Sequence, residues 1–285
     1  VFQAKRFGGD RIEPFRPAFR SVGSDRLQLE SDLRRAVERN ELSIVYQPIV
    51  QLSDMTVAGF EALLRWEHPR RGSIPPVEFI PLAEGCNIIG QLGQFAMSQA
   101  AAQLSLWQKT TGNSTVFMSV NLSSRQILRR DLVQEVRNIL ANSQVAKGTF
   151  KLELTESAVM ENPEQAVFIL DKIRSMGIGL SLDDFGTGHS SLAYLSRFPF
   201  DLLKIDKTFL HDESPKKFVL LKSMINMAHE LGLKVVVEGI ETDRDALQLR
   251  QLHCEFAQSY LFGEPMSAEN ALRLLREQNT AAVRA

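Results

Sequence analysis

Stretches with a strand pattern and stretches with a helix pattern alternate from residue 43 to residue 278, and this alternation constrains the fold most strongly. A strand, a helix and another strand repeated along one chain favour a parallel sheet. Eight strand patterns predict that the sheet closes into a TIM-type (β/α)8 barrel of the α/β class. The expected strands are 43–50, 57–64, 116–122, 150–154, 179–183, 202–205, 234–237 and 256–260.

The start of the barrel departs from this regular alternation. Only Leu52–Thr56 joins the first two strands, which is too short for a parallel crossover, so we expect one of the pair to run antiparallel. A charged helix is expected from Ser24 to about Arg39, and residues 1–23 are interpreted as the tail of a preceding domain plus a linker. Residues 24–285 then form one domain. Its other expected helices are 88–110, 125–142, 163–176, 216–231, 243–252 and 268–278.

Charge and cysteine content exclude some classes of function. The chain has 33 Lys and Arg against 34 Asp and Glu, so we expect no nucleic-acid polymer as a partner. Cys86 and Cys254 form no CxxC pair, which favours a reducing, cytoplasmic location over a disulfide scaffold. No signal peptide opens the chain, which starts with Val as if cut from a longer protein; that parent can be membrane-anchored through other parts.

Each expected strand contributes one polar side chain at or near its end. In a TIM-type barrel, polar residues at the carboxyl ends of the strands belong to the active site, whereas the strand middles form packed core. Taken singly, each residue also fits a turn or a solvated strand end. Their common position at strand ends favours a site formed by Gln47, Glu61, Asn121, Glu153, Asp183, Lys204, Glu238 and Gln258.

The stretch SLDDFGTGHSSL, from Ser181, places Asp183 and Asp184 side by side at a strand tip. Together with Glu61, Asn121 and Glu153 they form an oxygen-only donor set, which suits Mg²⁺ or Mn²⁺ better than zinc. Two cations that share Asp183 can activate water and stabilise a phosphoryl group under in-line attack. Lys204 can orient the water or neutralise the phosphate. The residues therefore predict metal-assisted phosphoester hydrolysis.

Nine ordered motifs between about residues 24 and 278 resemble the EAL domain family. The resemblance implies a phosphodiesterase that linearises the bacterial second messenger cyclic di-GMP to pGpG. The matching motifs are YQPIV at Tyr46, EALLRW at Glu61, FIPLAE at Phe79, NLSSRQ at Asn121, ELTES at Glu153, DDFGTGHSSL at Asp183, LLKIDKTFL at Leu202, VVVEGIET at Val235 and AQSYLFGEP at Ala257.

The resemblance also implies residue roles. The first metal ion, Mg²⁺ or Mn²⁺, is expected on Glu61, Asn121, Glu153 and Asp183. The second is expected on Asp183 and Asp184, assisted by Glu238. Lys204 positions the attacking water, and the water and metal network is supported by Glu241 and Gln258. Arg65 and Gln47 contact the nucleotide, Arg65 at a phosphate, and Glu156 holds the loop after Asp183. Calcium is expected to inhibit, because its looser coordination does not hold the geometry for attack.

Further expectations concern partners and departures from the family. We expect a homodimer through the region after Asp183, and an upstream regulatory domain, because residues 1–16 resemble the tail of a GGDEF-type domain. Ser259 and His253 stand where glycines are usual, and His189 stands where an aromatic residue is usual. Ser259 can crowd the backbone if its position requires a positive φ.

Two other classes of function remain as alternatives. A non-catalytic cyclic di-GMP receptor usually lacks equivalents of Glu61, Asp183 or Lys204, and all three are present here. An inert scaffold or dimerisation module leaves the acids at the strand ends without a purpose. The intact set of acids favours the enzyme.

Overall fold

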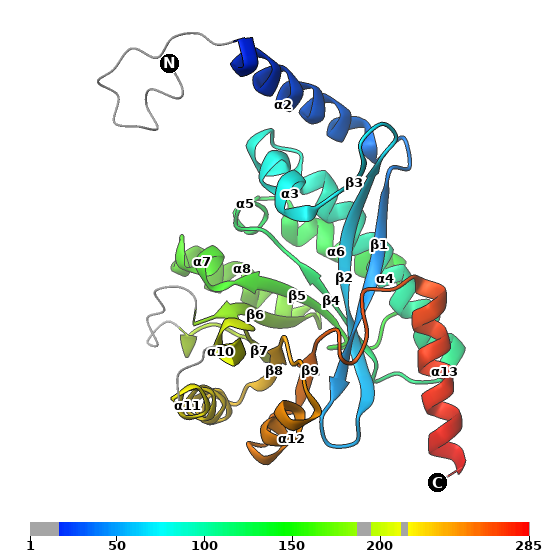
Figure 1. The fold of residues 1–285 in the computed structure, drawn as a ribbon, viewed down its shortest axis with the longest axis vertical. Helices are drawn as coiled ribbons and strands as arrows, with labels where there is room; N and C mark the ends of the chain where they lie inside the picture. The colour runs from blue at the N-terminus through cyan, green and yellow to red at the C-terminus, as the bar shows by residue number, and fades with distance from the viewer. Residues whose placement is uncertain (1–16, 187–194, 212–215, 285) are drawn as a thin grey trace.

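The computed structural model describes the backbone of residues 17–186, 195–211 and 216–284, and the side chains of 25–186, 195–210 and 216–278. In these residues eight strands close into a barrel in the order β1-β9-β8-β7-β6-β5-β4-β2, with β2 pairing back to β1 (Figure 1). The predicted TIM-type barrel is confirmed. Its strands are β1 (Leu42–Gln51), β2 (Thr56–His68), β4 (Phe117–Asn121), β5 (Phe150–Thr155), β6 (Gly179–Phe185), β7 (Leu202–Ile205), β8 (Lys234–Glu238) and β9 (Phe256–Gln258).

Strand β1 is the antiparallel member of the barrel. It pairs antiparallel with both β2 and β9, whereas the other barrel pairs are parallel. The antiparallel strand expected from the short Leu52–Thr56 link is therefore confirmed. Strand β2 continues beyond its predicted end at Leu64 and pairs with β3 (Gly72–Ile74), a strand too short for its sequence pattern to predict.

Helices surround the strands on the outside of the barrel (Figure 1). The expected helix 125–142 is wrong, because the chain leaves the helical path between α5 and α6, where the Arg129 guanidinium binds the Asp131 carboxylate. The short helices α3, α7 and α10 were not predicted.

No helix of the described ranges is long and apolar enough to cross a membrane. The helices are α2 (Pro17–Ala36), α3 (Pro76–Gly85), α4 (Ile89–Thr111), α5 (Ser124–Ile127), α6 (Leu132–Asn142), α7 (Glu156–Met160), α8 (Pro163–Ser175), α10 (Thr208–His211), α11 (Lys217–Glu230), α12 (Asp243–Gln251) and α13 (Ala268–Arg284).

Helix α2 differs from its prediction at both ends. It is already helical at Pro17, so a helix start at Ser24 is wrong. It ends at Ala36 rather than Arg39, because Asn40 takes a left-handed conformation with φ 56° and Glu41 N–H donates to the Ala36 carbonyl. Asn is one of the few non-glycine residues that adopt this conformation readily. The predicted tail over residues 1–16, like His189, lies outside the described residues.

Polar and apolar contacts attach α2 to the far end of β2. His68 Nδ1 accepts the backbone N–H groups of Arg70 and Arg71, so Nε2 carries the ring hydrogen and donates to Asp32 on α2 at 3.3 Å. Trp66 Nε1 donates to Glu41 Oε2 at 3.0 Å. Around these contacts lies a second hydrophobic cluster, separate from the main core. It includes Leu29, Leu33, Ala36, Trp66, Ile74, Phe79, Leu82, Ile89 and Leu92.

His253, which stands in place of the family's usual glycine, adopts φ 59° in the described structure. A side chain in the left-handed region raises the free energy of the folded state, and glycine does not. We expect His253→Gly to raise the free energy of unfolding by about 0.5–1 kcal/mol in urea denaturation. Arg250→Gly, at an exposed position in α12, should lower it instead. A destabilised His253→Gly variant would contradict the argument.

Candidate active site

The barrel interior is built in layers that follow the two-residue period of its strands. Ile49, Phe117, Leu202, Val236 and Phe256 form a small buried apolar cluster from five different strands. Two residues further along their strands, Leu202 is followed by Lys204, Val236 by Glu238 and Phe256 by Gln258. Because side chains two apart share a face of the sheet, the polar residues stand on this apolar floor.

The Lys204 ammonium is the centre of the polar layer. The residue is only 1% exposed, yet its Nζ lies within ion-pair distance of four carboxylates from four other strands. The distances from Nζ are 2.8 Å to Glu238 Oε1, 3.0 Å to Glu153 Oε2, 3.3 Å to Glu61 Oε2 and 3.5 Å to Asp183 Oδ1. Four acids and one base leave this buried cluster with an excess of acidic groups.

The pKa values of the cluster follow from burial and from this excess. Burial alone would lower the pKa of Lys204, but the surrounding carboxylates outweigh it and raise that pKa well above its usual value. Burial raises the pKa of Glu153 to about 8 and that of Glu238 to about 6, and the attraction of Lys204 offsets this only in part. For Glu61 the balance is reversed: its pKa is lowered despite burial, through Lys204 and neighbouring amide donors.

Glu61 is held by two side-chain amides as well as by Lys204. Asn121 Nδ2 donates to its Oε1 at 2.6 Å, and Gln258 Nε2 donates to its Oε2 at 2.7 Å. Gln258 also contacts Gln47 Oε1, at 3.2 Å. Strand register produces this arrangement, because Glu61 lies opposite Gln47 across the β1–β2 pair. The network fixes the Glu61 carboxylate at the centre of the barrel mouth.

The donor set fits a hard divalent cation. Glu153 Oε1 and Gln258 Oε1 are buried acceptors without a hydrogen-bond partner, and the carboxylates exceed the single ammonium. Oxygen donors with excess negative charge are the environment that Mg²⁺ and Mn²⁺ prefer. In the present side-chain arrangement, no three Asp, Glu, His or Cys side chains in the described residues form a metal-holding group. Lys204 lies between the carboxylates, and Asn121 turns its nitrogen toward Glu61, so a cation would require these side chains to shift.

Strand β6 ends in a bulge that separates its two acids. The pairing register with β7 shifts between Leu182 and Phe185, and Asp184 adopts φ 55°. Asp183 Oδ1 lies 3.5 Å from Lys204 Nζ, and burial together with the Asp183 charge raises the pKa of Asp184. Just beyond the bulge, Gly186 N–H donates to Glu156 Oε2 at 3.2 Å. Glu156 thus contacts the start of the loop after Asp183, the loop that it is expected to hold.

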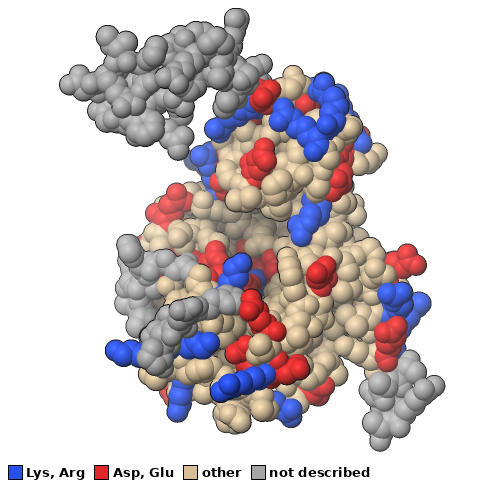
Figure 2. All heavy atoms as spheres, viewed as in Figure 1, with Lys and Arg blue, Asp and Glu red and all other residues tan. Residues whose placement is uncertain are grey.

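Two cavities adjoin the cluster. An acidic cavity of about 480 Å³ is lined by Gln47, Glu61, Asp183, Lys204, Lys207, Glu238, Gly239, Ile240, Glu241, Gln258, Ser259 and Tyr260. In Figure 2 acidic side chains gather around a hollow in this face of the molecule.

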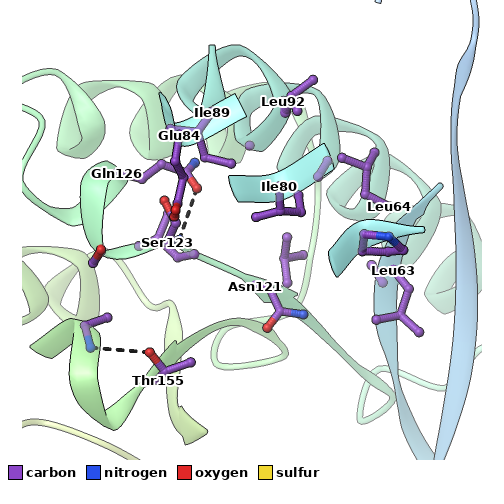
Figure 3. A pocket seen from close by; sticks show the side chains of 18 of the residues that line it. Leu63, Leu64, Ile80, Glu84, Ile89, Leu92, Asn121, Ser123, Gln126 and Thr155 are labelled. Atoms are coloured by element: carbon purple, nitrogen blue, oxygen red, sulfur yellow. Dashed lines mark hydrogen bonds between the residues drawn. The ribbon is translucent and has the colours of Figure 1, made fainter. Parts of the chain in front are cut away.

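A second, mainly apolar cavity of about 650 Å³ lies over β2, β4 and the start of α7. Figure 3 shows Leu63, Leu64 and Ile80 along one side of it and Asn121 at its floor. Asn121, which lines this cavity, also binds Glu61 of the acidic cavity, so the two spaces are neighbours. Arg65 lines the apolar cavity, and its Nη1 donates to the Leu64 carbonyl.

Ser259 does not have the backbone conformation that would make its side chain costly. It is 4% exposed and is absent from the described residues with positive φ. The steric conflict considered for a serine after Gln258 therefore does not arise.

Comparison with known proteins assigns the chain to a family. The EAL domain model matches residues 30–265. The chain is an EAL domain. It is 38% identical over 274 residues to the bifunctional diguanylate cyclase/cyclic di-GMP phosphodiesterase MucR of Pseudomonas aeruginosa, covering 95% of this chain and 40% of MucR. It is 39% identical over 281 residues to the cyclic di-GMP phosphodiesterase NbdA of the same organism, covering 97% of this chain and 36% of NbdA.

A solved structure gives the same assignment. The PaMucR phosphodiesterase in complex with c-di-GMP superposes with a TM-score of 0.82 and 40% identity, over 86% of this EAL domain and 99% of that chain. The EAL domain described here spans about two fifths of the length of the curated relatives MucR and NbdA.

Reasoning from strand ends missed the residues that lie elsewhere on the two cavities. Lys207 and Tyr260 line the acidic cavity, each two residues beyond the end of its strand. The apolar cavity is assembled from α3, α4, β2 and β4, so no single segment signals it. Ser119 and Ser181 are fully buried but line neither cavity; strand alternation could have found them, because each lies two residues before a predicted site residue, Asn121 or Asp183.

Removing the central ammonium should destabilise the EAL domain in a pH-dependent way. We expect Lys204→Met to lower the free energy of unfolding at about pH 8 by about 3–5 kcal/mol, because its carboxylates lose their counter-charge. Without Lys204 the folded-state pKa values of Glu153 and Glu238 rise further above the unfolded values, so the destabilisation is present at high pH and is lost as the pH falls. Urea unfolding at about pH 8 and about pH 5 measures the difference from wild type.

Lys207→Met is the matched control, since this lysine is exposed on the same cavity. It should change the free energy of unfolding by less than about 0.5 kcal/mol at either pH. A Lys204→Met penalty that stayed constant between the two pH values would contradict the electrostatic explanation.

Proposed function

We propose that this EAL domain hydrolyses cyclic di-GMP to linear pGpG and so lowers the level of the second messenger. The observation that carries the proposal is the buried Lys204 ammonium among four carboxylates at the mouth of the barrel. Similarity to MucR and NbdA, both named cyclic di-GMP phosphodiesterases, supports the substrate. So does the likeness to PaMucR in its c-di-GMP complex.

The proposal includes two divalent cations, Mg²⁺ or Mn²⁺. Glu61, Asn121, Glu153 and Asp183 would hold one, and Asp183 with Asp184 and Glu238 would hold the other. Such cations would activate water and offset charge on the phosphoryl group. The unpartnered Glu153 Oε1 and the surplus of carboxylates support a cation requirement.

The residues of the domain would position the reactants. Lys204 Nζ would donate to the attacking water, with Gln258 and Glu241 bordering the same cavity. The water oxygen bonds to phosphorus, the bond from phosphorus to the 3′ oxygen breaks, and a water proton ends on that oxygen. Arg65 would bind a phosphate, because its planar guanidinium matches phosphate oxygens. The apolar cavity beside Asn121 has room for a guanine base.

The wider setting is part of the same proposal. The domain would belong to a longer cytoplasmic protein with an upstream regulatory domain, in keeping with the partial coverage of MucR and NbdA. A homodimer contact would lie in the region after Asp183. A non-catalytic receptor is the weaker alternative, because it has no need for Lys204 and its four carboxylates.

Turnover tests the proposal directly. The purified domain with cyclic di-GMP and Mg²⁺ or Mn²⁺ should yield pGpG on a chromatogram, and EDTA should abolish the product. Asp183→Asn keeps the side-chain shape but removes the charge next to Lys204, so it should lower kcat at least about 100-fold. Asp171→Asn, at an exposed position on α8, is the matched control and should keep full activity. Binding of the nucleotide without any product would instead favour the receptor.

Calcium should separate binding from cleavage. Ca²⁺ has longer and more variable coordination distances than Mg²⁺, so it should permit nucleotide binding while suppressing pGpG formation. Isothermal titration with cyclic di-GMP in Ca²⁺, together with a chromatographic assay in the same buffer, measures both. Equal rates of pGpG formation in Ca²⁺ and Mg²⁺ would refute the expected inhibition.

A further inference from the structure

A third cavity lies between the outer helices α4 and α6, which pack against each other. Its volume of about 470 Å³ is typical of small-molecule sites in proteins. Among the described residues, it shares no lining residue with the two cavities of the candidate active site. Side-chain amides and hydroxyls from α4, from α6 and from the residue after α6 form much of its wall: Gln94, Ser98, Gln134, Asn138, Asn142 and Ser143.

Glu135 lines this cavity and carries a buried oxygen without a partner. Its side chain is only 8% exposed, and its Oε2 lies 3.3 Å from Arg129 Nη2. Its Oε1 is buried and has no hydrogen-bond partner in the part of the chain that the structure describes. A charged acceptor that loses water without gaining a donor lowers the stability of the fold. A bound molecule with a hydrogen-bond donor would restore the missing interaction.

Glu135 is also the surplus charge of the cavity. Arg129 Nε and Nη2 donate to Asp131 Oδ1 and Oδ2 at 3.0 and 2.6 Å, so this guanidinium is already paired with another carboxylate. Burial raises the pKa of Glu135 above its usual value, and the attraction of Arg129 offsets this effect only in part. A second positive charge in the cavity would stabilise the ionised Glu135 carboxylate.

Packing keeps Arg129 from serving Glu135 alone. The guanidinium lies against Gly90 of α4, where an added Cβ would collide with Nη1. The Arg129 backbone N–H donates to the Gln126 carbonyl at 3.0 Å, which fixes the chain just before the side chain turns toward α4. Because Gly90 and Asp131 hold the guanidinium in place, the free oxygen of Glu135 stays available to a ligand.

The lining favours an organic ammonium group over a metal ion. A divalent cation requires several oxygen ligands, but both oxygens of Asp131 are already used by Arg129. A primary ammonium has three N–H donors, which suit one carboxylate oxygen and the neighbouring amide and hydroxyl oxygens. Gln94, Ser98 and Ala102 line the cavity at intervals of four residues along α4, a length of about 12 Å. The cavity therefore has room for the rest of a small organic molecule.

We propose that the cavity between α4 and α6 binds a small hydrophilic organic amine, whose ammonium group donates to Glu135 Oε1. The amides and hydroxyls of the wall accept its other hydrogen bonds. This site does not depend on the proposed hydrolysis, because it shares no lining residue with the cavities at the barrel mouth.

Isothermal titration of the chain with the four-carbon diamine putrescine tests the inference. Wild type should show saturable binding, and the uncharged four-carbon diol should bind at least about tenfold more weakly. Glu135→Gln keeps the side-chain shape but removes the charge, so it should raise the Kd for putrescine about 10- to 100-fold. Glu230→Gln, at an exposed position on α11, is the matched control and should stay within about twofold of wild type.

A second variant tests the cavity from its opposite wall. Ser98 is exposed on α4, so Ser98→Leu should fold normally, fill part of the cavity and abolish putrescine binding while Glu135 remains in place. Circular dichroism checks the fold of both variants. If Glu135→Gln does not fold, Ser98→Leu decides the question.

Three results would overturn the inference. Absence of putrescine binding to wild type would exclude the site. Unchanged affinity in Glu135→Gln or in Ser98→Leu would assign the binding to other acids, such as those of the barrel mouth. Equal affinity for the diamine and the diol would show that the ammonium group is not recognised.

Discussion

One buried ammonium holds the barrel mouth together. Carboxylates placed this close and this far from water would repel one another, and their desolvation would favour their neutral forms. Lys204, within 3.5 Å of four of them, supplies the compensating charge and connects five strands of the barrel. Burial nevertheless raises the pKa of Glu153 to about 8, because a single positive charge offsets this effect only in part. The remaining excess of acids is the physical reason to expect cations at this site.

Because side chains alternate along each strand, the barrel interior contains an apolar layer that stabilises the fold and a separate polar layer that forms the site. The apolar floor of Ile49, Phe117, Leu202, Val236 and Phe256 supplies buried area, while the next inward positions carry the polar cluster. Because both layers use the same strands, polar groups can gather at one end without loss of the core beneath them. The second hydrophobic cluster, under α2 and α3, adds a wall to the apolar cavity through Ile89 and Leu92.

Much of the fold and of the polar cluster could be predicted from the sequence, because strand ends and their polar residues are local features. Lys204, Glu153 and Glu61 each stand among apolar residues in an expected strand, and closure of the sheet brings them together. Features that depend on packing between distant segments could not be predicted. The apolar cavity combines residues from α3, α4, β2 and β4, and the bulge at Asp183 and Asp184 depends on pairing between β6 and β7. The break between α5 and α6 was missed because the sequence continues the helical period through it.

The length of β2 has a mechanical consequence. The same strand carries Glu61 in the polar cluster and His68 in the contact with Asp32 of α2, about 23 Å apart at the rise of an extended chain. Because β2 pairs with β1 along nearly this whole distance, β2 is rigid rather than flexible between the two residues. A displacement of α2 that strains the Asp32–His68 contact would therefore be transmitted along β2, and it would shift the Glu61 carboxylate.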